Sequence, residues 1–197
     1  LFDVARAFDR CPLPAGGRVA IVTNAGGPGI MATDACVNLG LEIVSLGDET
    51  RRRLGEFLPS AASLDNPVDM IASANADRYR AVLDLVKKDP GVDGIIAIFV
   101  SPIMIDAYEV ARARADAADG KKPLLSVFMG KQRSQEGTEE LARRRVPVYR
   151  FPEEAASGMS ALVRYRSLRE APQGRSVTFR VRKQPARAAI AAARRAG

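Results

Sequence analysis

The 197-residue sequence contains no histidine and no tryptophan, and it has only two cysteines, Cys11 and Cys36. Without histidine, the chain cannot form a Ser–His or Cys–His pair, a histidine metal ligand or a phosphohistidine. The two cysteines do not make a disulfide framework, and their spacing does not suit a metal site. We therefore expect reduced thiols, as in a cytoplasmic protein, and no metal site.

Long hydrophobic runs are missing too. No apolar stretch approaches the roughly 20 residues that span a bilayer. The first residues, LFDVARAFDRCPLP, lack the basic and apolar regions of a signal peptide, and they lack a starting methionine. We expect no membrane partner, and we expect the chain to be a fragment of a larger polypeptide.

The net charge of +7 arises in one part of the sequence. Basic residues outnumber acidic ones only from Ser167 onward, whereas the preceding part is balanced. The basic tail holds a single aromatic residue, Phe179, so it lacks the interleaved aromatics that stack on single-stranded nucleic acid. A linker explains this tail better than a nucleic-acid-binding face does, and we expect no nucleic-acid partner.

Short apolar runs alternate with longer amphipathic ones through the body of the chain. Strands are predicted over 18–23, 41–45, 94–100, 123–128 and 147–150, and helices over 29–39, 48–57, 77–88, 107–118, 134–145 and 153–168. This alternation is typical of an α/β fold with a doubly wound, parallel five-stranded sheet, and the flavodoxin-like strand order 2-1-3-4-5 fits the length best. Asp48 is predicted to cap its helix, and SAASLDNPVDM to be a polar loop.

Three segments follow from this pattern. Residues 1–16 are predicted to be a segment that comes from a preceding domain. Residues 17–168 would form the flavodoxin-like domain, and residues 169–197 a basic linker and helix that lead toward another domain. The sequence shows no internal repeat.

The glycine-rich stretch after the first strand is the main candidate for binding. Its glycines do not match G-x-G-x-x-G, and no Gly-Lys-Ser/Thr follows, so the stretch does not indicate NAD or a P-loop nucleotide. Such a bare turn can still present backbone N–H groups to an anion at a helix N-terminus. The alternative is a turn that only packs strand against helix. The predicted anion-binding residues are Asn24, Ala25, Gly26, Gly27, Gly29 and Ile30.

Two further stretches are predicted at the same edge of the sheet. Asn66 and Asp69 are expected to support the loops by capping or hydrogen bonding, and Ser101, Pro102 and Ile103 could line an acyl or carboxylate pocket. For residues 101–103, an ordinary strand-to-helix turn is equally compatible with the sequence. No carboxylate pair suggests acid–base catalysis, so we expect no catalytic residue within this chain. The runs Arg51–Arg53 and Arg143–Arg145 are expected to lie on solvated helix faces.

The motifs TNAGGPG, NPVD and FPEEA occur in this order, and the sequence around them resembles one domain of the NDP-forming acyl-CoA synthetases, relatives of succinyl-CoA synthetase. The resemblance covers about residues 1–165. It implies the second flavodoxin-like CoA-ligase domain of such an enzyme, with an ATP-grasp domain following in single-chain members. It also implies that the whole enzyme converts acyl-CoA, nucleoside diphosphate and phosphate to acid, CoA and nucleoside triphosphate, using CoA, ATP or ADP, and Mg²⁺.

In this family, a histidine on a preceding domain carries the phosphoryl group and lies between two helix N-termini. The resemblance implies that Asn24, Gly26 and Gly27 stabilise the phosphohistidine or acyl phosphate, and that 101–103 lie near the acyl carboxylate. The implied partners are upstream CoA-binding and histidine-bearing domains, a downstream ATP-grasp domain and a small acyl substrate. The chain alone is then expected to bind none of the cofactors and to be inactive.

A second function fits the same resemblance. Synthetase-like domains also occur fused to GNAT acetyltransferases, where they serve regulation and binding. A phosphorylatable histidine upstream favours the ligase, whereas a neighbouring acetyltransferase domain favours the regulator. The sequence leaves open the acyl group and whether the nucleotide is adenine or guanine.

Overall fold

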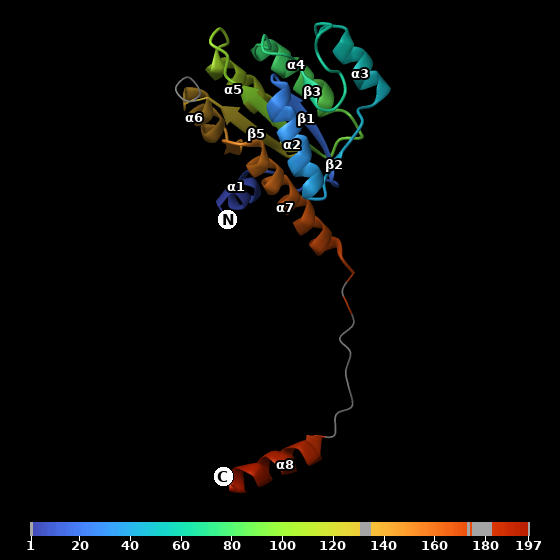
Figure 1. Ribbon diagram of the computed structural model, residues 1–197, viewed down its shortest axis with the longest axis vertical. Coiled ribbons are helices and arrows are strands. Elements are labelled where there is room, and N and C mark those ends of the chain that lie inside the picture. The colour runs from blue at the N-terminus through green and yellow to red at the C-terminus, as the bar shows by residue number, and fades with distance from the viewer. Residues whose placement is uncertain (1, 131–134, 173, 175–182, 197) are drawn as a thin grey trace.

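A computed structural model of the chain describes residues 2–130, 135–172, 174 and 183–196 (Figure 1). The strands are β1 Arg18–Thr23, β2 Glu42–Ile43, β3 Val68–Asp69, β4 Gly94–Val100, β5 Leu124–Met129 and β6 Val148–Tyr149. The helices are α1 Phe2–Arg10, α2 Gly26–Asn38, α3 Asp48–Gly55, α4 Ala76–Val86, α5 Ala107–Ala117, α6 Gln135–Arg143, α7 Pro152–Glu170 and α8 Lys183–Ala196.

The strands form one parallel sheet in the order β2-β1-β4-β5-β6, which confirms the predicted doubly wound topology. The longest pairing joins β4 to β5, from Ile95 opposite Leu124 to Val100 opposite Met129. Both strands are buried almost throughout, which explains their continuous apolar sequence.

Helices cover both faces of the sheet (Figure 1). On one face, α1 and α2 pack against α7, and their small side chains, such as Ala7 and Ala32, belong to the same buried core as Ile21 of β1. On the other face, α3 to α6 lie side by side over a core that includes Phe99 and Tyr79. The sheet is thus covered by a core on each face, and the loops lie at the two ends of its strands.

Three details of the sequence prediction are corrected. The stretch predicted to be wholly loop contains β3, which is only two residues long and pairs with β1. Helix α2 begins at Gly26 rather than Gly29. The prediction that Asp48 caps α3 was wrong, because Gly47 is the cap residue and no side chain caps that helix. Asp48 instead pairs with Arg51 on the helix surface.

Helix α1 lies within the segment predicted to come from a preceding domain, and it packs against the sheet domain. The Phe8 ring meets Tyr165 of α7 edge-on, with 5.3 Å between ring centroids. The Tyr149 hydroxyl of β6 donates a hydrogen bond to the Asp3 carbonyl oxygen at 3.0 Å. The division of the chain into three segments stays a prediction.

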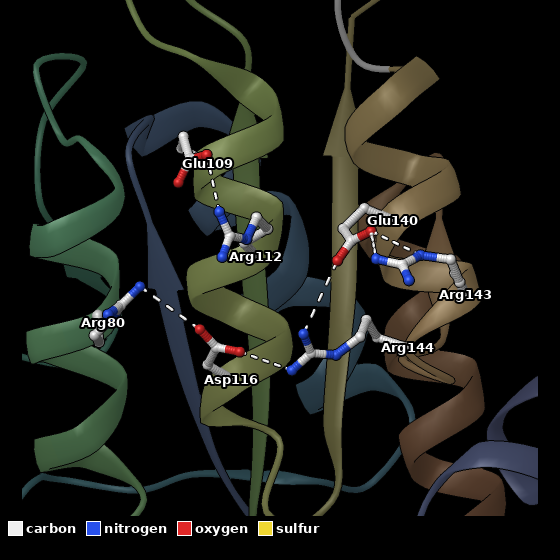
Figure 2. A network of polar contacts seen from close by, with 7 residues as sticks. All are labelled: Arg80, Glu109, Arg112, Asp116, Glu140, Arg143 and Arg144. Atoms are coloured by element: carbon white, nitrogen blue, oxygen red, sulfur yellow. Dashed lines mark hydrogen bonds and ion pairs between the residues drawn. The ribbon is translucent and has the colours of Figure 1, made fainter.

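Charged side chains cover the outer surfaces of α4, α5 and α6 (Figure 2). Asp116 of α5 pairs with Arg144 at 2.7 Å and with Arg80 of α4 at 3.6 Å. Glu140 of α6 pairs with Arg143 and, at 4.0 Å, with Arg144. The Asp116 pairs are half-exposed and contribute little stability each, whereas the Glu140 carboxylate is only 4% exposed and depends on its arginine partners for compensation of its charge.

Helix α5 carries a fully buried arginine, Arg114. The Arg114 guanidinium donates to the carbonyl oxygens of Ala97 and Val127, which joins the helix to β4 and β5. It also lies over the rings of Tyr79 and Phe128, 5.7 and 5.3 Å from their centroids. Burial disfavours the charge and lowers the pKa of Arg114 to about 10.

The amino-terminal edge of the sheet is fastened by charged side chains. Asp93, just before β4, accepts two hydrogen bonds from the Arg18 guanidinium at 2.8 and 2.9 Å and one from the Arg18 amide at 3.1 Å. The Arg18 hydrogen bonds lower the pKa of Asp93. Asp89 accepts from the amides of Gly47 and Gly91 at 2.8 Å each.

Candidate anion-binding site

The candidate site lies where the strand order reverses, between β1 and β4. The chain leaves β1 toward α2 on one face of the sheet and leaves β4 toward α5 on the other. Ligands of doubly wound sheets bind in the crevice that this arrangement opens at the carboxyl ends of the strands. The segments 24–29, which include the first turn of α2, and 101–106 both belong to this edge.

Asn24 joins the two loops. Its side-chain Nδ2 donates to the Val100 carbonyl oxygen at 3.0 Å, and its Oδ1 accepts from the Val100 amide at 2.9 Å. The residue is only 2% exposed. Both ends of the amide are therefore engaged by the end of β4, and the geometry gives Asn24 a positioning role for the loop.

The first turn of α2 is open to solvent. The cap residue Ala25 is extended, with φ of −151°, and no side chain caps the helix. Gly26 and Gly27 are exposed, whereas the Gly29 amide already donates to the Ala25 carbonyl oxygen at 3.3 Å. Gly29 is buried, and a Cβ there would lie 3.1 Å from Thr23 Cγ2, so this glycine serves close packing.

The predicted anion-binding residues therefore differ in what they can offer. Gly26 and Gly27 present amides at the helix N-terminus, where the helix dipole favours negative charge. Ile30 follows on α2 with its side chain 64% exposed. Ala25 contributes its backbone to the turn, because its amide donates to Thr23 Oγ1 at 3.0 Å. The sequence pattern alone could not separate these roles.

Asn66 lies beside β1, between the points where β2 and β3 pair with that strand. Its Oδ1 accepts from the Ile21 amide at 2.8 Å. Its Nδ2 donates to the carbonyl oxygens of Val19 and Val44 at 2.8 and 2.9 Å. The Asn66 side chain thus forms hydrogen bonds with β1 where the pairing with β2 ends and before the pairing with β3 begins. This is a structural role, away from the open turn.

Asp69 ends β3 and lies beside the open turn. Its Oδ1 accepts from the Ile71 amide at 2.9 Å. Its Oδ2 would be 3.2 Å from a Cβ at Gly26. The sequence predicted a supporting role for Asp69, and the structure brings its carboxylate next to the first residue of α2.

The segment after β4 is more exposed than the pattern indicated. The Ser101 amide donates to the Met129 carbonyl oxygen at 3.0 Å, which extends the pairing with β5. Ile103 and Met104 are 81% and 90% exposed. A cavity of about 440 Å³ opens beside them and is lined by Ile103, Met104, Ile105, Asp106, Ala107, Tyr108 and Glu136.

Only Ile103 of the predicted acyl-site residues lines this cavity; Ser101 and Pro102 do not. Sequence reasoning missed Met104 and Tyr108, although an apolar Ile-Met-Ile run directly after a strand was a usable signal. The described residues include no group of three or more Asp, Glu, Cys or His side chains that could hold a metal ion. Among the same residues, no helix has the length and apolar character to cross a membrane.

Residues 19–173 match the family described as "Ligase-CoA domain". The chain belongs to this family. This Ligase-CoA domain is 41% identical over 169 residues to the acetate–CoA ligase (ADP-forming) II subunit alpha of Pyrococcus furiosus, covering 83% of the chain and 36% of that protein. It is 32% identical to the 4-hydroxybutyrate–CoA ligase (ADP-forming) of Nitrosopumilus maritimus, covering 95% of the chain and 27% of that protein.

Solved structures give the same picture of the Ligase-CoA domain. PH0766 from Pyrococcus horikoshii OT3 matches with a TM-score of 0.79 and 41% identity, over 82% of this chain and 38% of that one. The acetyl-coenzyme A synthetase 1 of Ca. Korarchaeum cryptofilum, in complex with phosphate and ADP, matches with a TM-score of 0.80 and 30% identity, over 85% and 37%. The chain spans about a third of the length of these relatives.

Proposed function

We propose that this Ligase-CoA domain forms the acyl and phosphoryl side of the active site in an ADP-forming acyl-CoA synthetase. The complete protein would convert acyl-CoA, ADP and phosphate to the free acid, CoA and ATP. Because this chain contains no histidine, the phosphorylated histidine would come from a preceding domain. CoA, nucleotide and Mg²⁺ would bind to CoA-binding and ATP-grasp domains of the same protein or its partner subunit.

The open first turn of α2 is the observation that carries this proposal. It lies at the switch point of the sheet and presents the Gly26 and Gly27 amides without a capping side chain. Backbone N–H groups fixed at a helix N-terminus stabilise developing negative charge on a phosphoryl or acyl oxygen without reorganising. Asn24 would fix this turn relative to β4, and the segment 101–103 would approach the acyl group.

Titration with phosphate and acetyl phosphate, followed by the chain's backbone amide NMR signals, tests this proposal. We expect saturable shifts concentrated at the open amides of Gly26 and Gly27, with smaller shifts at Gly29 and Ile30, which follow in the same helix. Saturable shifts elsewhere, with these four amides unchanged, would contradict the assignment. Absence of any shift at millimolar ligand would mean that this chain does not bind the anion by itself. The same titration on the complete protein, with its neighbouring domains, would then decide whether this turn binds the anion at all.

A matched pair of variants identifies the donor. A Cβ at Gly27 meets no atom within 4 Å, so Gly27→Ala adds a methyl group to open space and keeps the N–H. Gly27→Pro places a Cβ in the same open space and removes the N–H. We expect Gly27→Ala to bind phosphate like the parent chain and Gly27→Pro to bind at least about tenfold more weakly, the loss expected for a hydrogen bond to a charged group. Equal binding by both variants would exclude the Gly27 amide as a donor.

A further inference from the structure

Helix α8 presents a surface that is both basic and apolar. None of its residues is buried, and Ile190 is 58% exposed. Lys183, Arg187 and Arg194 recur at intervals of four and seven residues, so they lie on one stripe of the helix. Ile190 falls on the same stripe, beside a face made mostly of alanine, and the helix contains no acidic residue. Because an isolated helix of 14 residues is marginal in water, we expect α8 to bind a surface of complementary character.

A surface of that character lies between α5 and α6. Two cavities, of about 440 and 340 Å³, share Tyr108 and Glu136 in their walls and so adjoin each other. Together they form one depression, the α5–α6 groove. The larger cavity is bordered by Ile103 and Met104, which are 81% and 90% exposed. Single exposed apolar side chains are common in soluble proteins, but adjacent ones at the border of a groove are typical of an interaction site.

Carboxylates surround the α5–α6 groove. Asp106, Glu136 and Glu139 are exposed along it, and within the described part of the chain no ion pair involves any of them. Arg143, the basic residue among the described residues of its wall, is already paired with the Glu140 carboxylate (Figure 2). These described residues therefore leave negative charge without a cation, and the positive charge of α8 complements it.

The length of chain between α7 and α8 favours a groove on another copy. Helix α7 begins near the carboxyl edge of the sheet, and its 19 residues extend about 28 Å toward the amino-terminal edge. Its last turns point away from α5 and α6, which lie on the other face of the sheet (Figure 1). Residues 171–182 then connect α7 to α8, and a segment of this length spans at most about 40 Å when fully extended. Within one copy this segment would have to run back along α7 and around the sheet, whereas a second copy can present its groove directly.

We propose that α8 of one copy binds in the α5–α6 groove of a second copy of this chain, with its apolar residues against Met104 and its basic stripe facing Glu136 and Glu139. An amphipathic helix in an apolar groove is a common mode of recognition, and here the charge at the rim selects the partner. A contact the size of one short helix lies at the low end of interface areas, so the association is weak and sensitive to salt. The proposal goes beyond the proposed function and does not depend on the α2 turn.

Charge reversal on each side of the contact tests this proposal. The groove variant carries Glu136→Lys and Glu139→Lys, and the helix variant carries Arg187→Glu and Arg194→Glu. Analytical ultracentrifugation of the parent chain from about 5 to 500 μM covers the range of weak association. We expect the parent chain to self-associate. Each variant alone should do so at least about fivefold more weakly, because two surface ion pairs are replaced by repulsion.

An equimolar mixture of the two variants is the sharper measurement. The basic groove of one variant then meets the acidic helix of the other, and the unchanged helix meets the unchanged groove, so the mixture should associate about as well as the parent chain. Asp34→Lys is the control, because Asp34 is exposed on α2, on the other face of the sheet, and its reversal should leave the association unchanged. The amide signals of Met104 and Ile190 should shift with the concentration of the parent chain.

Four results would overturn the proposal. A parent chain that stays monomeric at all these concentrations would show that the copies do not meet. Association that neither variant weakens would place the contact elsewhere, and so would a mixture that associates no better than each variant alone. A shift of the Met104 amide in the helix variant, at concentrations where the parent chain is monomeric, would show that α8 occupies the groove of its own copy. Phosphate binding at Gly26 and Gly27 is measured separately, so the proposed function stands or fails by its own titration.

Discussion

The two edges of the sheet are built differently. At the amino-terminal edge, Asp93 is 3% exposed and takes three hydrogen bonds from Arg18. At the carboxyl-terminal edge, Gly26 and Gly27 are exposed without a capping side chain, and Met104 is 90% exposed. One edge uses charged side chains to fasten the strands, while the other leaves backbone and apolar groups open to solvent.

This difference separates stability from binding within one small sheet. Loops at the carboxyl edge of a doubly wound sheet hold ligands because the crevice opens there, and they can keep open amides only if other contacts stabilise the fold. The asymmetry predicts that substitutions at the fastened edge change the free energy of unfolding and leave phosphate binding intact. Substitutions at the open edge should do the reverse, except at Asn24.

The largest effect is expected for Asp93→Asn. The variant loses the charge that faces Arg18, and its amide group places N–H donors where Asp93 had acceptors. Because Arg18 is half-exposed and can be hydrated, we expect a loss of about 2–3 kcal/mol in the free energy of unfolding, below the upper range for fully buried pairs. Urea unfolding measures it.

The control for this prediction is Asp65→Asn, which removes an exposed partner of Arg51 and should change stability by less than about 0.5 kcal/mol. Phosphate titration of Asp93→Asn should still shift the Gly26 and Gly27 amides. If Asp93→Asn were as stable as the parent chain, the amino-terminal edge would not be the fastened one.

Asn24→Ala should have the next largest effect and should break the separation of the two edges. It removes two hydrogen bonds to Val100 from a site that is 2% exposed. We expect a loss of about 1–2 kcal/mol and weaker phosphate binding, because the turn before α2 is no longer fixed to β4. Unchanged phosphate affinity would mean that the turn keeps its shape without Asn24.

The two buried aspartates of the amino-terminal edge, Asp93 and Asp89, should have a smaller effect, on the pH dependence of stability. The Arg18 hydrogen bonds lower the pKa of Asp93. At Asp89, burial raises the pKa, but the bonds from Thr50, Gly47 and Gly91 outweigh it and the net shift is also downward. A lowered folded-state pKa contributes stability that is present above the unfolded value, near 3.9 for Asp, and is lost as the pH falls through the folded value.

We therefore expect the free energy of unfolding to fall as the pH is lowered from about 5 toward 2, and to fall less steeply in Asp93→Asn. Chemical unfolding at several pH values measures both slopes. Parallel curves for the two proteins would show that Asp93 does not titrate differently in the folded and unfolded states.

The smallest effect is expected for Met104→Ser at the open edge. The residue is 90% exposed, so its side chain makes few contacts that the substitution could remove. We expect the free energy of unfolding to change by no more than about 0.5 kcal/mol. Thermal unfolding is sufficient to measure it. A larger loss would reveal that the segment after β4 contributes to the fold.

The sequence predicted the parallel sheet and its strand order because β1, β4 and β5 are largely apolar and lie between clear helical patterns. It missed β3 because two residues in a polar loop carry no periodicity. It placed the start of α2 too late because glycines disfavour helix, while here they form its first turn. Hydrogen bonding by Asn66 and the approach of Asp69 to Gly26 depend on contacts between residues 22 to 47 positions apart, which no local pattern encodes.

The three hydrogen bonds of Asn66 have a consequence for how this fold can vary. The chain leaves β1's neighbour β2 at Val44 and returns at Asn66, whose Nδ2 lies 2.9 Å from the Val44 carbonyl oxygen. The intervening segment, which includes α3, is thus a loop whose two ends are held together by this hydrogen bond. Lengthening such a loop adds little closure entropy, so insertions at the exposed residues 60–61, or a proteolytic cut there, should leave the sheet and the α2 turn in place.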